Sequence, residues 1–138
     1  MITIPLIPMP APRPRFSKFG TYNPKSYTEY KKNLLQLARI QSKSYFNGGI
    51  KLEVVFYMQI PASLSEKKQS ELIEQVYHIK KPDTDNLIKS VKDSLEGTFY
   101  KNDSQVCVVN AKKVYSHKPR TEINLISLEQ TKWQINYY

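Results

Sequence analysis

The chain has 138 residues, of which 21 are Lys or Arg and 12 are Asp or Glu, so its formal net charge is +9. Hydrophobic residues at 40% and charged residues at 24% argue against disorder, and no apolar run approaches the roughly 18–20 residues of a membrane span. A single cysteine excludes an internal disulfide framework. One cysteine and two histidines are also too few soft ligands for a zinc finger. We expect a single cytoplasmic domain over residues 1–138 that binds a polyanion.

The first predicted element is a strand over residues 2–7, followed by a proline-rich extended arm over residues 8–15. The pair Asn23-Pro24 is typical of a helix start, and a helix is expected over residues 26–44. Its predicted apolar face comprises Tyr27, Tyr30, Leu34, Leu37, Ala38 and Ile40.

The central part of the sequence predicts one strand and two helices. Residues 50–60 alternate between apolar and polar positions, which indicates a strand. Ser63 with Glu66 three residues later forms a capping-box pattern and predicts a short helix that ends near residue 76. A third helix is expected over residues 84–96, and Gly97 is well placed to end it.

Two further strands are predicted, over residues 104–115 and 121–128, and we expect them to pair antiparallel through a short turn. Strands and helices mix without regular βαβ alternation. The predicted fold class is therefore α+β, with a small mixed or antiparallel sheet flanked by helices. The tail carries aromatic side chains that are expected to pack on the body or on another subunit, namely Trp133, Tyr137 and Tyr138.

Charges are distributed unevenly along the chain. Acidic residues are absent from residues 1–28 and from residues 104–121, whereas all four aspartates lie between these basic stretches, at Asp83, Asp85, Asp93 and Asp103. Carboxylates among cations would repel a phosphate backbone unless a divalent cation bridges the two. The alternative is a solvated acidic turn on a basic surface.

The aspartates are spaced as a metal site would require. Asp83 and Asp85 lie two residues apart at the start of the third predicted helix, so both carboxylates can face one cation. Lys89 follows Asp85 by one helical turn, and Asp103 begins the next strand, where we expect it to join the other two. Such a group suits phosphodiester hydrolysis with Mg²⁺ or Mn²⁺, with Lys89 supplying positive charge to the transition state.

Simpler explanations apply to single members of this group. Asp83 or Asp85 alone is more often a helix cap, and Asp93 is spaced to pair with Lys89 on the helix surface.

Residues 81–106, KPDTDNLIKSVKDSLEGTFYKNDSQV, closely resemble the signature of the RusA family of Holliday-junction resolvases, and residues 10–34 resemble its basic N-terminal arm and first helix. The resemblance implies a homodimeric, Mg²⁺-dependent endodeoxyribonuclease, often encoded by phage or prophage, without a small-molecule cofactor. Such an enzyme cuts four-way DNA junctions with paired symmetric nicks during recombination and repair. The metal-binding aspartates of the family fall on Asp83, Asp85 and Asp103, and its essential lysine falls on Lys89.

The resemblance covers further positions of the same signature. The matching positions include Asn86, Ser104 and Gln105, which we expect to orient the metal ligands without binding the metal themselves. Many members carry a second acid just before the last ligand, where this chain has Asn102.

Basic and aromatic side chains suggest how a dimer would hold a junction. The expected phosphate contacts are Arg13, Arg15, Lys18, Lys25, Lys80 and Lys81, with Lys112 and Lys113 as further candidates. Interleaved aromatic residues are suited either to stacking on opened bases or to core and dimer packing, namely Phe16, Phe19, Tyr22 and Tyr77. Two other functions stay open: a non-catalytic basic nucleic-acid-binding module, and a metal-dependent nuclease for flaps, forks or RNA.

Overall fold

The computed structural model describes residues 1–13, 15–17, 20–22 and 24–128. Its strands are β1 (Ile2–Ile4), β2 (Arg15–Ser17), β3 (Gly20–Tyr22), β4 (Ile50–Gln59), β5 (Val106–Ser116) and β6 (Arg120–Ser127). Its helices are α1 (Lys25–Gln41), α2 (Glu66–Leu72) and α3 (Thr84–Leu95), with a 3-10 turn, η1, over Asp103–Gln105. The predicted α+β class is confirmed.

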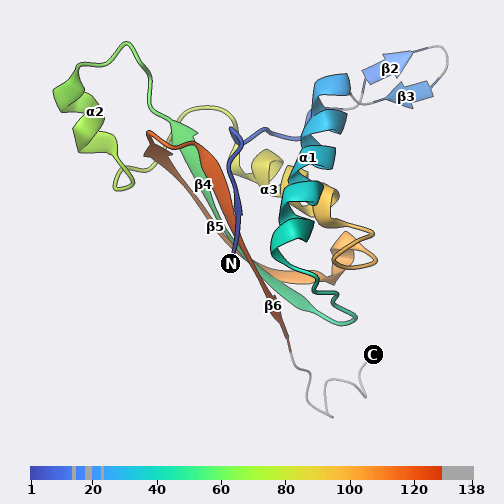
Figure 1. The fold of residues 1–138 in the computed structure, drawn as a ribbon. Coiled ribbons are helices and arrows are strands. Elements are labelled where there is room, and N and C mark those ends of the chain that lie inside the picture. Colours follow the sequence, from blue (N-terminus) through green and yellow to red (C-terminus); the bar gives the residue numbers. More distant parts are fainter. Residues whose placement is uncertain (14, 18–19, 23, 129–138) are drawn as a thin grey trace.

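The main sheet is mixed, with strand order β1-β6-β4-β5. β4 runs antiparallel to β6 and parallel to β5, and β1 runs antiparallel to β6 (Figure 1). The parallel pair needs a crossover connection, and this connection carries α2 and α3. The prediction that residues 104–115 and 121–128 form a hairpin is wrong. β4 alternates regularly between buried and half-buried residues and takes the central place between β5 and β6.

Helices α1 and α3 lie on one side of the main sheet (Figure 1) and share one core with it. The fully buried members of this core include Leu34 of α1, Leu87, Val91 and Leu95 of α3, and Phe56 of β4. Ile40, predicted in the core, is 77% exposed. It lies about 200° around α1 from Ala38, because each residue of an α-helix advances about 100°.

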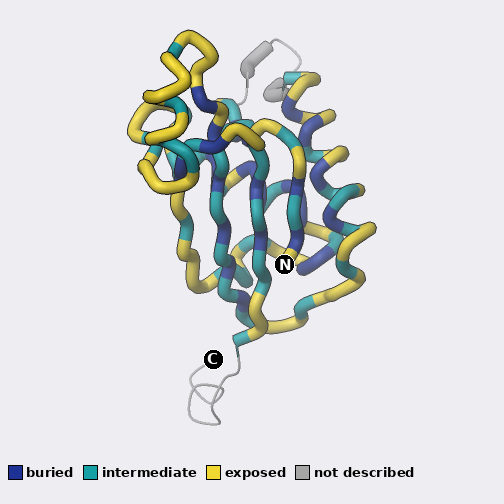
Figure 2. Tube along the Cα trace, turned by 60° about the vertical axis from the view of Figure 1, so that its left-hand side comes forward, coloured by how far each residue is buried: buried dark blue, intermediate teal, exposed yellow. Residues whose placement is uncertain are grey.

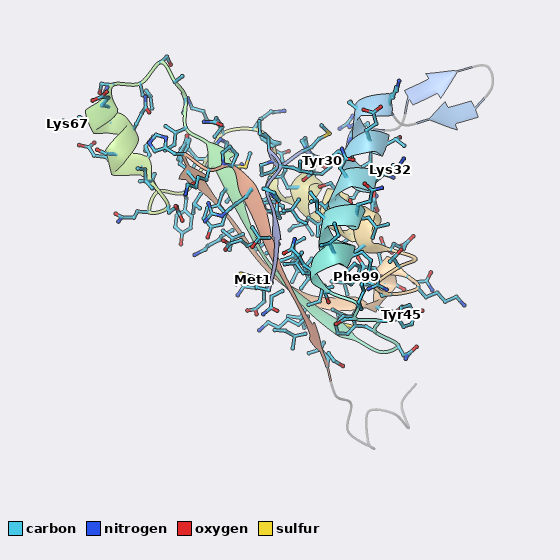
Figure 3. The ribbon with its side chains drawn as sticks, in the orientation of Figure 1. Met1, Tyr30, Lys32, Tyr45, Lys67 and Phe99 are labelled. Carbon is cyan, nitrogen blue, oxygen red and sulfur yellow. The ribbon has the colours of Figure 1, made fainter. Side chains whose placement is uncertain are left out.

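The short helix α2 projects from the body, and its side chains, such as Lys67, reach away from the core (Figure 3). It begins at Ser65, whose hydroxyl accepts the N–H of Lys68 at 3.3 Å, and not at the predicted Ser63. Figure 2 shows the contrast between this exposed segment and the sheet, where buried and intermediate residues alternate. The predicted end of α3 is confirmed, since the helix ends before Gly97, which has a φ of 87°.

The N-terminal arm crosses the start of α3 and then forms a small β2–β3 hairpin that was not predicted. Several predicted contact or packing residues lie outside the described residues, namely Lys18, Phe19, Trp133, Tyr137 and Tyr138. The side chains of three others are not described, namely Arg15, Phe16 and Tyr22. Among the described helices, none has the length and apolar content required to span a bilayer.

Leu87→Ala tests the packing that fixes α3. Leu87 is fully buried, so the variant should lose about 2–5 kcal/mol of unfolding free energy through lost burial and a residual cavity. Urea denaturation measures this loss. The matched variant Ile40→Ala should change stability by no more than about 0.5 kcal/mol, since its side chain is exposed. Equal effects in the two variants would contradict the packing.

Candidate functional site

The connection that leads into α3 is fixed to the edge of β5 by main-chain hydrogen bonds. The N–H of Glu74 donates to the carbonyl of Tyr115 at 2.7 Å, and the N–H of Tyr115 donates to the carbonyl of Val76 at 3.3 Å. The N–H of His78 donates to the carbonyl of Lys113 at 2.9 Å. The chain therefore reaches α3 from a defined position on the sheet.

Lys113 completes this attachment from inside the protein. Its side chain is only 8% exposed, and its ammonium donates to the carbonyls of Lys80 at 2.5 Å and Pro82 at 2.6 Å. Burial lowers the pKa of Lys113, and the nearby Asp83 carboxylate opposes that shift. The interpretation of Lys113 as a phosphate contact is therefore wrong. Its ammonium holds the main chain immediately before Asp83.

Two carboxylates stand at the start of α3. Asp83 occupies the N-cap position, but its side chain makes no capping hydrogen bond, and Asp85 lies in the first turn. Both residues are exposed. The Asp83 carboxylate is thus not engaged in capping the helix, which weakens the simplest structural explanation for it.

The N-terminal arm forms a groove with this end of α3. The N–H of Ala11 donates to the carbonyl of Asn86 at 2.9 Å, which docks the arm on the first turn of the helix. The resulting open groove has a volume of about 500 Å³ and is lined by Pro10, Ala11, Pro12, Arg13, Lys81, Pro82, Asp83 and Asn86. Two of the predicted phosphate-binding cations, Arg13 and Lys81, therefore share a groove with Asp83.

Lys89 lies further along α3, in an ion pair. Its ammonium is 3.2 Å from a carboxylate oxygen of Asp93, and the hydroxyl of Tyr27 on α1 donates to the same oxygen at 3.0 Å. Burial, followed by the Asp93 charge, raises the pKa of Tyr27 far above its ordinary value. The predicted pairing of Lys89 with Asp93 is confirmed, and Tyr27 is a partner that the sequence spacing did not indicate.

Asp103 sits in the 3-10 turn that precedes β5. Its N–H donates to a carboxylate oxygen of Glu96 at 2.9 Å. The Gln105 side chain holds this turn, because its oxygen accepts the N–H groups of Lys101 and Asn102 at 3.0 Å each. Its amide nitrogen donates to two carbonyls of the 46–48 loop, also at 3.0 Å.

The three predicted metal ligands lie at opposite ends of one helix. Asp83 and Asp85 start α3, whereas the N–H of Asp103 donates to Glu96 at its C-cap, and the 13 residue steps from Asp83 to Glu96 span about 20 Å along the axis. Within the described ranges, no three acidic, histidine or cysteine side chains lie close enough to hold one metal ion. The expected convergence is therefore not formed by a single chain.

The supporting residues and cations separate into several environments. Asn86 contributes to the groove, Gln105 holds the Asp103 turn, and Ser104 is exposed. Lys25 is 3.9 Å from Glu29 in an exposed ion pair, whereas three predicted contact residues are exposed near the edge of β5 or the connection beside it, namely Lys80, Lys112 and Tyr77. The sequence did not indicate that the carboxylate of Glu96 lies beside Asp103, because the position of Glu96 before Gly97 predicted only a helix end.

Gln105→Met tests the support of the Asp103 turn. The variant keeps the side-chain volume but leaves four main-chain groups without this partner, so it should lose about 1 kcal/mol or more of unfolding free energy. Chemical denaturation provides the measurement. Ser104→Ala is the matched control at an exposed neighbour, and a loss no larger than that of the control would contradict the role of Gln105.

Comparisons with known proteins identify the family of this chain. A family profile described as "Endodeoxyribonuclease RusA" matches residues 5–126, which include the arm, the groove and all three aspartates. The chain is also similar to the uncharacterized protein YqaN of Bacillus subtilis (strain 168), with 36% identity over 101 residues that cover 70% of this chain and 71% of that protein. The match over most of its length shows that the chain belongs to the RusA endodeoxyribonuclease family.

Proposed function

We propose that this protein is a divalent-metal-dependent endodeoxyribonuclease that resolves four-way DNA junctions by paired symmetric nicks, in recombination and repair. Family membership supports the nuclease chemistry. The observation that carries the proposal is the groove at the start of α3, which combines the Asp83 carboxylate with Arg13 and Lys81. A phosphodiester nuclease needs both a metal-binding acid and cations that hold the DNA backbone.

The two acids at the start of α3, of which Asp83 lines the groove, fit a magnesium ion. Asp83 and Asp85 are exposed, and carboxylate oxygens are the hard ligands that Mg²⁺ and Mn²⁺ prefer. In phosphate-processing sites Mg²⁺ is commonly held by one or two carboxylates together with waters and substrate phosphate. When bound, the ion would lower the pKa of a water nucleophile and stabilise the leaving oxygen.

The remaining groups of this site bind and orient the substrate. Arg13 and Lys81, which line the groove with Asp83, hold backbone phosphates of the DNA without reading bases. Lys89 supplies a positive charge to the phosphorane formed in the transition state. Asp93 keeps the Lys89 ammonium on this face of α3, and the Tyr27 hydroxyl orients Asp93 in turn.

A homodimer resolves the distance between the acids. Since about 20 Å of helix separates Asp83 from the Asp103 end in one chain, a second chain is the direct source of another Asp103. In this proposal each site combines Asp83 and Asp85 of one chain with Asp103 of the other. A two-fold dimer also presents two such sites to the two equivalent phosphates of a four-way junction.

Cleavage of a synthetic four-way junction tests the function. With Mg²⁺ the wild-type protein should produce paired symmetric nicks, and Asp85→Asn should lower the rate at least about 100-fold, because even residues that only support metal ligands contribute 10–100-fold. Glu66→Gln, at an exposed acid of α2 far from the groove, should cut at the wild-type rate.

Other outcomes of the same experiment identify the alternatives. Junction binding that falls steeply with salt but never leads to cleavage would indicate a non-catalytic nucleic-acid-binding module. Faster cleavage of flaps, forks or RNA than of the junction would identify a different nuclease. Either result contradicts the proposed resolvase.

Mixing two inactive variants tests the shared site. Asp85→Asn and Asp103→Asn chains should each be inactive alone, but a mixed dimer retains one site with every acid intact. Random mixing makes half of the dimers mixed, each with one of two sites active, so nicking should recover to about one quarter of the wild-type level. Strand-resolved gels measure this recovery. A mixture as inactive as its components would contradict a site shared between chains.

A further inference from the structure

Exposed apolar side chains gather along one edge of the main sheet. Among the described residues ten large apolar side chains are exposed, and five of them lie on β5 or on the segment beside it. On β5 these are Val108 at 43% and Val109 at 41%, and on the neighbouring segment they are Val76 at 38%, Tyr77 at 65% and Ile79 at 89%. A concentration of this kind on one edge is typical of a protein interface.

The main chain of this edge is also available for pairing. β5 is an outer strand, and the segment around residues 74–78 covers it only near Lys113 and Tyr115. Because main-chain groups of a strand alternate in direction, those of Val109 and Ala111 also point outward. No described segment pairs with residues 108–112 on this side. Of these five residues only Lys112 is charged, so the edge carries just one of the charges that normally protect an outer strand.

We propose that the outer edge of β5, residues 108–112, pairs antiparallel with the same edge of a second copy of this chain. The two four-stranded sheets then form one continuous sheet across a two-fold axis. The inference rests on the homodimer of the proposed function and identifies the surface that forms it.

The charges at the two ends of β5 favour a second copy in this orientation. Glu96 and Asp103 lie at the start of the strand, whereas Lys80, Lys81 and Lys112 lie toward its end and outnumber Asp83 there. Antiparallel pairing brings each acidic end toward the basic end of the partner, and parallel pairing would bring like charges together. Asp103 lies at the acidic end of β5, and Asp83 lies beside the other end. Antiparallel pairing therefore brings Asp103 of one chain toward Asp83 of the partner, as the shared site requires.

The alternation defines a register for the pair. If both outward residues are used, Val109 of each chain pairs with Ala111 of the other and Asn110 lies on the two-fold axis. The two Asn110 residues then form a non-hydrogen-bonded pair, with Cα atoms about 4.5 Å apart. This separation falls within the range that a disulfide bridges.

Disulfide trapping tests the surface without DNA or magnesium. In a Cys107→Ser background, which removes the one native cysteine, Asn110→Cys should form a covalent dimer in most chains under mild oxidation on a non-reducing gel. Ile40→Cys, exposed on α1, is the matched control and should stay monomeric. Cross-linking of Asn110→Cys no greater than that of the control would overturn the inference.

A charge placed on the edge gives an independent measurement. Val109→Lys should halve the sedimentation mass at concentrations where the wild-type protein has the mass of two chains, because the two lysines would be diagonal neighbours on one face of the joined sheet, about 7–8 Å apart. Ile40→Lys should keep the mass of two chains. A cooperative thermal unfolding transition in Val109→Lys confirms that the chain folds, even if loss of the dimer lowers its midpoint, and a folded Val109→Lys dimer would overturn the inference.

These results separate the interface from the proposed function. A wild-type protein that nicks junctions but shows neither cross-linking nor a mass change in Val109→Lys retains the function and loses this interface. A cross-linked dimer whose wild type never nicks DNA retains the interface and loses the function.

Discussion

The position of α3, fixed by burial of one of its faces, sets the geometry of the whole site. Leu87, Val91 and Leu95 are fully buried in the core, so the helix can neither slide nor tilt freely over the sheet. Its start carries Asp83 and Asp85, and its end holds Asp103 through the carboxylate of Glu96. A rigid helix of three turns thus separates acids that a single metal ion would need to bring together, and the proposed dimer follows from that separation.

Buried and exposed charges have different tasks around this helix. Lys113 is buried and bonds main-chain carbonyls, so its charge fixes the approach to Asp83 and does not face DNA. Arg13 and Lys81 instead line an open groove with Asp83. Between the two ends of α3, Lys89 and Asp93 form a pair that Tyr27 connects to α1. The carboxylates are therefore placed by the fold, and the cations beside them remain available to phosphate.

Local patterns predicted most elements, and long-range pairing could not be read from them. The alternation in Ile50–Gln59, the start of α3 after Pro82 and its end before Gly97 were all predicted, because each depends on neighbouring residues. The position of β4 between β5 and β6 depends on contacts between distant segments, and this is why the hairpin prediction was wrong.

The same division applies to the candidate site. Charge distribution and spacing suggested Asp83, Asp85, Asp103 and Lys89 as one site and the resemblance supported it, whereas their separation along α3 required the structure. Adjacent Lys112 and Lys113 looked alike in the sequence, yet strand alternation exposes the first and buries the second. Gln105 matched a motif position, but its bonds to the 46–48 loop link segments almost 60 residues apart.

Magnesium-dependent melting tests most directly whether the acids at both ends of α3 belong to one metal site. An ion that binds only the folded protein raises its melting temperature, so Mg²⁺ should stabilise the wild type. The account predicts that Asp85→Asn and Asp103→Asn each abolish most of this rise. A rise that Asp103→Asn retains in full while Asp85→Asn loses it would contradict the shared site.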